Sequence, residues 1–155
     1  MSSSGIRVAP AAAAERSIVA DLMTRQLAEH EILISPEALL AAIDGVLLDE
    51  RRGLMLLAKH DRLAVGVAYV SFTWSLEHGG KSSWLEELYV LPEWRSRGIG
   101  ASMLSAAIEE ARLRGCAAVD LEVESAHERA AHLYARSGFT RHARTRWVKK
   151  LRPSV

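Results

Sequence analysis

The sequence predicts a single α/β domain, a sandwich in which about four helices flank a mixed central β-sheet of six to seven strands. The chain has 155 residues, enough for one domain with a sizeable buried core. Segments with the 3.6-residue spacing of helices are interspersed with short apolar runs typical of strands. Their order is a strand, two helices, a run of strands, then strand–helix–strand–helix–strand, which differs from the regular alternation of a doubly wound fold. We expect residues 1–4 to be a disordered start and residues 5–155 to form the domain.

The N-terminal third predicts one short strand and two helices. Ile6–Val8 is a candidate first strand, and residues 11–30 carry apolar side chains at helical spacing. Ser35-Pro36 predicts the start of the second helix, because serine caps free N–H groups and proline fits the first turn. That helix continues to Leu47.

Three strands are expected next. Leu54–Ala58 and Leu63–Thr73 predict a hairpin that turns at His60-Asp61-Arg62. Glu77–Ser83 contains two adjacent glycines and predicts a loop. Trp84–Leu91 predicts a strand, which ends at a proline.

The next segment predicts a helix followed by a strand. Apolar residues from Ile99 to Ala111 recur at helical spacing, and Gly115 ends the helix. A strand is predicted from Cys116 to Val123, and it opens with the apolar run Cys116–Val119. Cys116 is the only cysteine, which excludes an intramolecular disulfide, and its place in an apolar run predicts a buried structural thiol.

The C-terminal segment predicts a short helix and a last strand. Ser125 and Glu128 form a capping box ahead of the helix, which ends at Gly138. Phe139–Leu151 predicts the last strand, bent or split near Ala143. Because apolar residues interleave its basic ones, a strand with one solvated face is favoured over a nucleic-acid-binding patch.

The composition, 49% hydrophobic and 25% charged residues, is typical of a soluble globular protein. The formal net charge of +1 argues against nucleic acid as a partner. The N-terminus lacks the basic segment and long apolar core of a signal peptide, and no run is long enough to span a membrane. A cytoplasmic protein without a membrane partner is therefore expected.

The turn Arg95-Ser96-Arg97-Gly98-Ile99-Gly100 opens the predicted helix in a way that suits an anion. The positive end of a helix normally carries acids in its first turn, but no Asp or Glu occurs between Arg95 and Ile108. Two arginines crowd this end instead. Gly98 and Gly100 lack a Cβ, so a ligand can approach the backbone closely. The sequence therefore predicts a diphosphate-binding turn.

Two segments resemble the GNAT superfamily of N-acetyltransferases. From Leu85 to Gly100, a strand with an apolar end and a proline leads into the pattern [Arg/Gln]-x-x-Gly-x-[Gly/Ala], and residues 130–139 are similar to the family's Ala-x-x-Leu-Tyr-x-x-x-Gly-Phe segment. Both lie at the family's usual separation. The resemblance implies an acyltransferase that moves an acetyl group from its co-substrate acetyl-CoA to a primary amine of a small molecule or peptide. No metal is expected, and a homodimer is left open.

The resemblance also implies which residues bind the co-substrate. The strand end, formed by Leu88, Tyr89 and Val90, would pair with the pantetheine arm. Arg95 or Arg97 would add charge at the diphosphate. The backbone amides that would hold the diphosphate are those of Ser96, Arg97, Gly98, Ile99, Gly100 and Ala101. His127 stands where the family often has an asparagine that contacts the pantetheine arm, so that role is open.

Tyr134 and Glu86 are the candidates for catalysis. Tyr134 matches a tyrosine that in many members protonates the leaving thiolate, although its helical spacing suits a core position equally well. Glu86 aligns with an acid that several members use near the acceptor, where it would help to deprotonate the amine. Because side chains alternate along a strand, we expect Glu86 and Glu87 on opposite faces. Glu87 or a chain of waters could serve instead, and Glu86 could pair with an arginine at the rim.

Other functions have weaker support. A dinucleotide-binding domain needs a small residue where Met103 stands, and too little chain follows for its second half. His127 and His132 would point about 140° apart on a helix, unlike the pairs that bind zinc. A non-catalytic module that binds acetyl-CoA is the alternative to an enzyme. The segments expected to bind the acceptor carry acids and an aromatic residue that suit a cationic amine: Glu29, Glu31, Glu37, Trp74 and Glu77.

Overall fold

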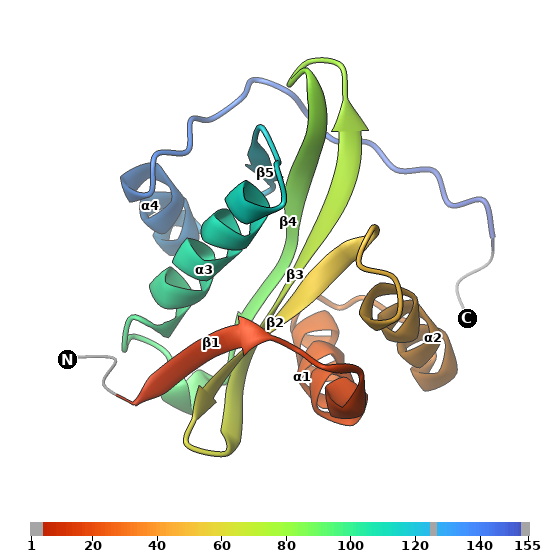
Figure 1. Ribbon diagram of the computed structural model, residues 1–155, viewed down its shortest axis with the longest axis vertical. Coiled ribbons are helices and arrows are strands. Elements are labelled where there is room, and N and C mark those ends of the chain that lie inside the picture. The colour runs from red at the N-terminus through yellow and green to blue at the C-terminus, as the bar shows by residue number, and fades with distance from the viewer. Residues whose placement is uncertain (1–4, 125–126, 153–155) are drawn as a thin grey trace.

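The computed structural model describes residues 5–124 and 127–152, which form an α/β sandwich (Figure 1). The strands are β1 Ile6–Pro10, β2 Gly53–His60, β3 Leu63–Ser75, β4 Gly80–Val90 and β5 Val119–Leu121. The α-helices are α1 Arg16–Glu29, α2 Pro36–Leu47, α3 Ile99–Leu113 and α4 Glu128–Arg136. Two short 3₁₀ turns, Ala13–Glu15 and Pro92–Trp94, precede α1 and α3.

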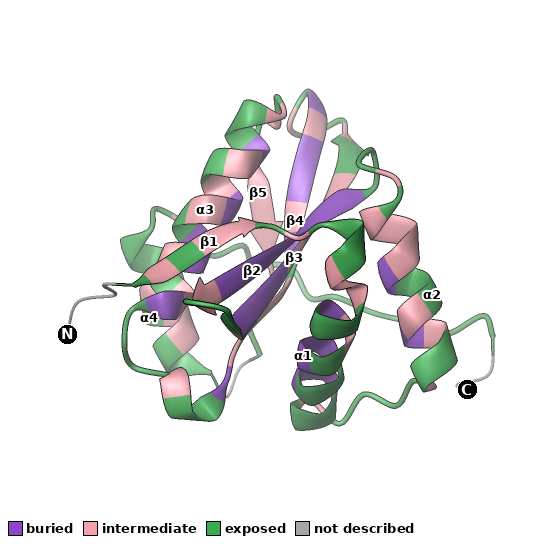
Figure 2. Ribbon diagram, turned by 60° about the horizontal axis from the view of Figure 1, so that its bottom comes forward, coloured by how far each residue is buried: buried purple, intermediate pink, exposed green. Residues whose placement is uncertain are grey.

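The sheet is mixed, as the sequence predicts. Its order is β1-β2-β3-β4-β5, with antiparallel pairing from β1 to β4 and parallel pairing between β4 and β5. The helices α1 and α2 cover one face, and α3 and α4 lie on the other (Figure 1). The buried side chains concentrate on β2, β3 and the inward sides of α1 and α3 (Figure 2). This arrangement leaves the C-terminal half of β4 between α1 and α4.

The two N-terminal helices form where local signals predict them. The Ala38 amide donates to the Ser35 hydroxyl at 3.2 Å, so Ser35 caps α2 as expected from the Ser-Pro pair. Arg16 of α1 donates two hydrogen bonds to Asp44 of α2, at 2.7 and 2.6 Å. This pairing fixes α2 beside α1 on the same face of the sheet.

The predicted loop at Glu77–Ser83 is wrong in its second half, because β4 already begins at Gly80. Ser82 and Ser83 are fully buried, and both hydroxyls donate to the Ala118 carbonyl, at 3.3 and 2.9 Å. A buried hydroxyl with a hydrogen-bond partner is tolerated in a strand interior. Since that partner lies 35 residues away in the chain, local composition did not reveal the strand.

A β-bulge at Glu86 corrects the expected placement of the two acids on opposite faces. Tyr69 of β3 pairs with Glu87 and Val70 pairs with Leu85, so Glu86 is the extra residue on β4. Ser71 lies on the same face of β3 as Tyr69, and its hydroxyl donates to Glu86 at 2.9 Å. Both carboxylates therefore reach the same face, since a bulge interrupts the alternation of side chains.

The strand count of six to seven is too high for the described residues, in which the sheet has five strands. The expected last strand, Phe139–Leu151, is an irregular segment that passes behind β3 and β4 near their hairpin end, in the view of Figure 1, without joining the sheet. Its apolar side chains Trp147, Val148 and Leu151 are 90%, 78% and 89% exposed. A segment with apolar–polar alternation becomes a strand only where a neighbouring strand supplies hydrogen bonds. No strand of the described chain pairs with residues 139–150.

Two further expectations concern β5 and α4. The strand is shorter than Cys116–Val123, and Cys116 lies half-buried before it instead of inside it. Glu128 begins α4 as expected. The proposed capping residue Ser125 and the expected disordered start, residues 1–4, lie outside the described residues. In the described ranges, no helix has the length and apolar character needed to cross a membrane.

Candidate active site

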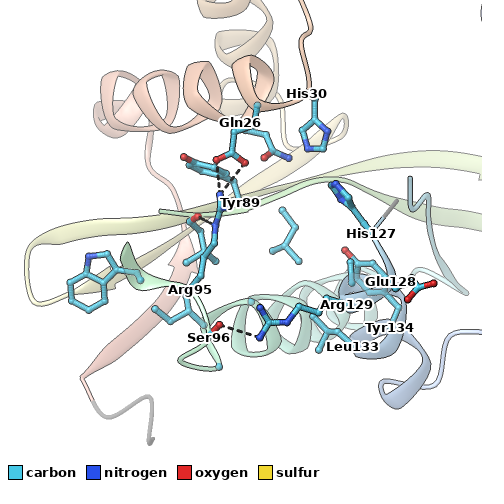
Figure 3. Close-up of a pocket in the computed structure, with 18 residues that line it drawn as sticks. Gln26, His30, Tyr89, Arg95, Ser96, His127, Glu128, Arg129, Leu133 and Tyr134 are labelled. Carbon is cyan, nitrogen blue, oxygen red and sulfur yellow. Dashed lines mark hydrogen bonds and ion pairs between the residues drawn. The ribbon is translucent and has the colours of Figure 1, made fainter. Parts of the chain in front are cut away.

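A pocket of about 750 Å³ lies between α1, the end of β4, the start of α3, and α4 (Figure 3). It contains most of the binding residues expected from the sequence: Leu88, Tyr89, Val90, Arg95, Ser96, Gly98, Ile99, Gly100, His127 and Tyr134. Glu29, one of the acids expected near the acceptor, also lines it. Its other lining residues were not singled out as binding residues: Gln26, His30, Trp94, Glu128, Arg129, Ala130 and Leu133. Arg97, Ala101 and Glu86 do not line it.

The turn before α3 exposes backbone amides at one end of the pocket. Ser96 and Gly98 have φ values of +62° and +79°, so this turn depends on left-handed backbone conformations. Gly98 is the N-cap of α3, no side chain caps the helix, and its first turn carries no acid. A Cβ built on Gly100 meets no atom within 4 Å. The first-turn amides are therefore open to an anion, which the helix dipole also favours.

Arg95 and Arg97, the two arginines of this turn, are engaged with the protein. Arg95 donates to the Val90 carbonyl at 2.8 Å and to the Glu29 carboxylate at 2.8 and 3.0 Å. Arg97 donates to the Glu93 carbonyl at 3.1 Å and stacks on the indole ring of Trp94, although Arg97 itself does not line the pocket. Arg95 thus links β4 to α1 at the pocket wall.

Arg129 of α4 is the basic residue that the sequence analysis missed. Its guanidinium donates to the Ser96 hydroxyl at 3.3 Å, across the opening in front of α3 (Figure 3). The sequence shows Arg129 only as a basic residue next to Glu128 in the first turn of a short helix. Such residues are common on solvated helix faces, so this position alone did not indicate a binding role. Only the folded chain brings Arg129 to the turn before α3.

The end of β4 offers an unpaired backbone edge to a ligand. β5 pairs with β4 only from Ser83 to Leu85, and within the described chain no strand lies beside residues 88–90 on that side. The opposite edge is taken by β3. The Val90 carbonyl already accepts from Arg95, so an extended ligand arm could hydrogen-bond to the other backbone groups of this edge, as an added strand would.

Tyr134 lies on α4 at the pocket wall and packs edge-on against Phe139, with 5.9 Å between the ring centres. The side chain is half-buried, and burial raises the pKa of its hydroxyl above the usual value. Tyr134 therefore stays protonated through the physiological range and can donate a hydrogen bond or a proton. It is both a partly packed residue and a pocket residue, so the two interpretations of it do not conflict.

The two acids of β4 differ in environment. Glu86 is exposed and accepts its hydrogen bond from Ser71, away from the pocket lining. Glu87 is half-buried, and the side-chain amide of Gln26 donates to it at 3.0 Å. Burial raises the pKa of the Glu87 carboxyl, while the Gln26 hydrogen bond and nearby His30 oppose that rise. The sequence selected Glu86, but the structure brings Glu87 closer to the pocket through Gln26.

A cluster of three polar side chains, His30, Glu124 and His127, lies at the end of α1. The Nδ1 atom of His30 lies 2.9 Å from a Glu124 carboxylate oxygen, and Nε2 of His127 lies 3.9 Å from the other oxygen. The two imidazole rings are 5.8 Å apart between centres. His127 therefore faces a histidine and a carboxylate, a setting unlike the one expected from its alignment with asparagine. His30 carried no signal in the sequence, because a histidine at a helix end is usually solvated.

The raised pKa of Glu87 leads to a prediction about stability. The native state binds this proton more tightly than the unfolded chain does, so ionised Glu87 costs stability as pH rises through its folded-state pKa. Glu87→Gln removes that cost. We expect the variant to gain stability relative to wild type between pH 4 and pH 8, measured by thermal unfolding at each pH. Glu86→Gln controls for the loss of one negative charge. A stability difference between Glu87→Gln and wild type that narrows with rising pH would contradict burial of the Glu87 carboxyl as the cause.

Comparison of the chain with known proteins identifies its family. The model of the acetyltransferase (GNAT) family matches residues 19–139. The thialysine N-epsilon-acetyltransferase of Mus musculus is 32% identical over 129 residues, which cover 72% of this chain and 71% of the mouse protein. A mycothiol acetyltransferase of Propionibacterium freudenreichii subsp. shermanii is 44% identical over 57 residues, but this match covers 35% of the chain and only 18% of that relative's length.

The fold agrees with solved structures. An aminoglycoside N-acetyltransferase in complex with CoA superposes with a TM-score of 0.80 at 19% identity, over 94% of this chain and 95% of that one. The family match extends over most of the described sheet, the turn before α3, and α4 up to residue 139. The chain therefore belongs to the GNAT acetyltransferase family.

Proposed function

We propose that this protein transfers an acetyl group from acetyl-CoA to the primary amine of a cationic small molecule or peptide. The observation that carries the proposal is the uncapped N-terminus of α3, which opens into a pocket continuous with the unpaired edge of β4 and with Tyr134. A diphosphate, an extended pantetheine arm and a thioester fit these three features in that order. The structural relative solved with CoA supports the same co-substrate.

Each part of the pocket would make a distinct contribution. The first-turn amides of α3 would hold the diphosphate, with Arg129 as the charged partner and Arg95 fixing the wall between β4 and α1. A hydrogen bond from a charged donor contributes about 1.5–3 kcal/mol. Leu88 and Val90 would pair with the amide groups of the pantetheine arm, which would place the thioester toward Tyr134 and His127.

The proposed reaction is direct attack within a ternary complex. The neutral amine nitrogen adds to the thioester carbonyl carbon, the carbon–sulfur bond breaks, and the Tyr134 hydroxyl protonates the sulfur that leaves. The attacking nitrogen gives up one proton to water as the amide forms, and Tyr134 regains its proton from solvent. A thiol of pKa about 8.5 leaves readily, so this proton assists the step but is not indispensable. An amine of pKa about 10.4 must first lose a proton, which costs about 4.6 kcal/mol at pH 7. Because Glu86 lies outside the pocket lining, we do not assign this deprotonation to it.

A cationic acceptor suits the acids around the acceptor end of the pocket. Glu87 of β4 and Glu124 before α4 do not line the pocket themselves, but they hydrogen-bond to its lining residues Gln26 and His30. Glu29 lines the pocket, but Arg95 pairs with it. The mouse relative is named for a lysine analogue and the structural relative for aminoglycosides, and both kinds of substrate carry primary amines.

Initial-rate kinetics test the proposal. With thialysine, kanamycin and spermidine as acceptor probes, we expect CoA release and intersecting double-reciprocal lines, because both substrates must be bound together. Cys116, the only thiol, lies half-buried before β5 and outside the pocket lining. Parallel lines with an acetylated Cys116 would contradict direct attack. Binding of acetyl-CoA without turnover of any amine would favour a non-catalytic module.

A further inference from the structure

The histidine at the end of α1 has the geometry of a proton acceptor for the incoming amine. We propose that His30, oriented by Glu124, takes the proton from the acceptor ammonium. This inference rests on the acetyl transfer proposed above and assigns a residue to its unassigned step. It depends on three observations: the position of His30 in the pocket, its fixed hydrogen bond, and the settings of the competing groups.

His30 lies in the pocket wall at the end remote from the turn before α3. The ring projects from α1 toward His127, whereas Tyr134 comes from α4 on the other wall (Figure 3). A thioester that reached Tyr134 would thus meet an amine arriving from the His30 side. The acid and the base would then act on opposite sides of the carbonyl, one on the leaving sulfur and one on the attacking nitrogen.

The hydrogen bond to Glu124 sets the tautomer of His30. With 2.9 Å between Nδ1 and the carboxylate, Nδ1 carries the hydrogen and donates it, which leaves the lone pair on Nε2. Nε2 can then accept the ammonium proton. The imidazolium that forms is paired with Glu124 and sits at the negative end of the α1 dipole, since His30 is the C-cap residue. It returns the proton to solvent after the product leaves.

The other groups near His30 are less suited to the step. His127, the residue before α4, lies 3.9 Å from Glu124, too far for a hydrogen bond, and is half exposed. Glu87 on β4 accepts a hydrogen bond from Gln26, which occupies part of its capacity. Of the two acids next to His30 in the sequence, Glu29 is paired with Arg95 and Glu31 is exposed beyond the end of α1. His30, at 22% exposure, combines a fixed orientation with access to the pocket.

The test compares histidine variants in the full chain. His30→Gln keeps a polar side chain of similar length but cannot take up a proton. At pH 7 we expect kcat/KM for the best of the three amine probes to fall by about 10²–10³-fold, the range of a general base. The Kd for acetyl-CoA should stay within about twofold. The matched control is His132→Gln, because His132 is exposed on α4 and outside the pocket lining, and its kcat/KM should be unchanged.

The pH profile separates catalysis from a structural role. An ascending limb of log kcat/KM, the signature of a base that must lose its proton, should be present in wild type and in His132→Gln, and absent from His30→Gln. Glu124→Gln should keep the limb but lower its plateau, because the imidazolium loses its partner. His127→Gln should keep the limb.

The outcomes distinguish this inference from the proposed function. An active wild type whose limb survives in His30→Gln overturns the role of His30 and leaves acetyl transfer standing. A limb that disappears in Glu87→Gln and not in His30→Gln assigns the base to β4 and also overturns the inference. A wild type that binds acetyl-CoA but acetylates none of the probes overturns the proposed function, and the role of His30 with it.

Discussion

Gly100→Val is expected to abolish the thermal stabilisation that acetyl-CoA gives the protein, and with it the turnover. Gly100 lies in the first turn of α3, where the amides are open, and a Cβ there meets no protein atom within 4 Å. The valine side chain would instead occupy the space that the diphosphate needs. Because binding at 100 times Kd stabilises a fold by about 2.7 kcal/mol, loss of binding is readily measured as a lost shift in Tm.

Gly100 is a better position for this test than Gly98. Gly98 has a φ of +79°, so a valine there would strain the backbone whatever the ligand does. Ser105→Val is the matched control, since Ser105 is exposed on the same helix about a turn further on. The apo Tm of both variants should stay near that of wild type, which shows that α3 is intact.

A phosphate-free pantetheine fragment completes the experiment. It should stabilise wild type much less than CoA does, because it can pair with β4 but leaves the α3 amides unused. Equal stabilisation by the fragment and by CoA would contradict binding of the diphosphate at the turn before α3. A normal acetyl-CoA shift in Gly100→Val would do the same.

Local signals in the sequence predicted the features that depend on neighbouring residues. Ser35 caps α2 because the chain places its hydroxyl next to the first-turn amides, and this requires no distant partner. The Arg–Gly turn likewise predicted a helix start open to an anion, because the absence of acids from its first turn can be read directly from the sequence. The mixed sheet followed from the order of the elements, and β1 to β4 form close to the expected positions.

Features that depend on distant partners were missed. The bulge at Glu86 exists only relative to the register of β3, so alternation assigned its side chain to the wrong face. The expected last strand depended on a neighbour that the described chain does not supply. His30 gains its orientation from Glu124, which is 94 residues away. No local pattern distinguishes such a histidine from one on a solvated helix end.

Tyr134→Phe is expected to lower kcat by tens to about a thousandfold while acetyl-CoA affinity stays within a few fold. The substitution keeps the ring and its edge-on contact with Phe139, and removes only the hydroxyl that would protonate the sulfur. The lower end of the range falls below that of most general acids because the thiol leaves readily without help. Tyr69→Phe is the matched control: Tyr69 is a half-buried tyrosine on β3 that does not line the pocket.

The direction of the Tyr134 pKa shift gives the prediction a second readout. Burial raises the pKa of this hydroxyl above its usual value of 10.0, so the acid form persists until strongly alkaline pH. The single-turnover rate of wild type should therefore show no descending limb below pH 10 from this group, and in Tyr134→Phe the rate should be reduced by a constant factor across that range. Single-turnover measurement matters because product release could otherwise mask the chemical step. An unchanged single-turnover rate in Tyr134→Phe would leave the residue with its packing against Phe139 alone, and the sulfur would then leave as the thiolate, protonated by solvent.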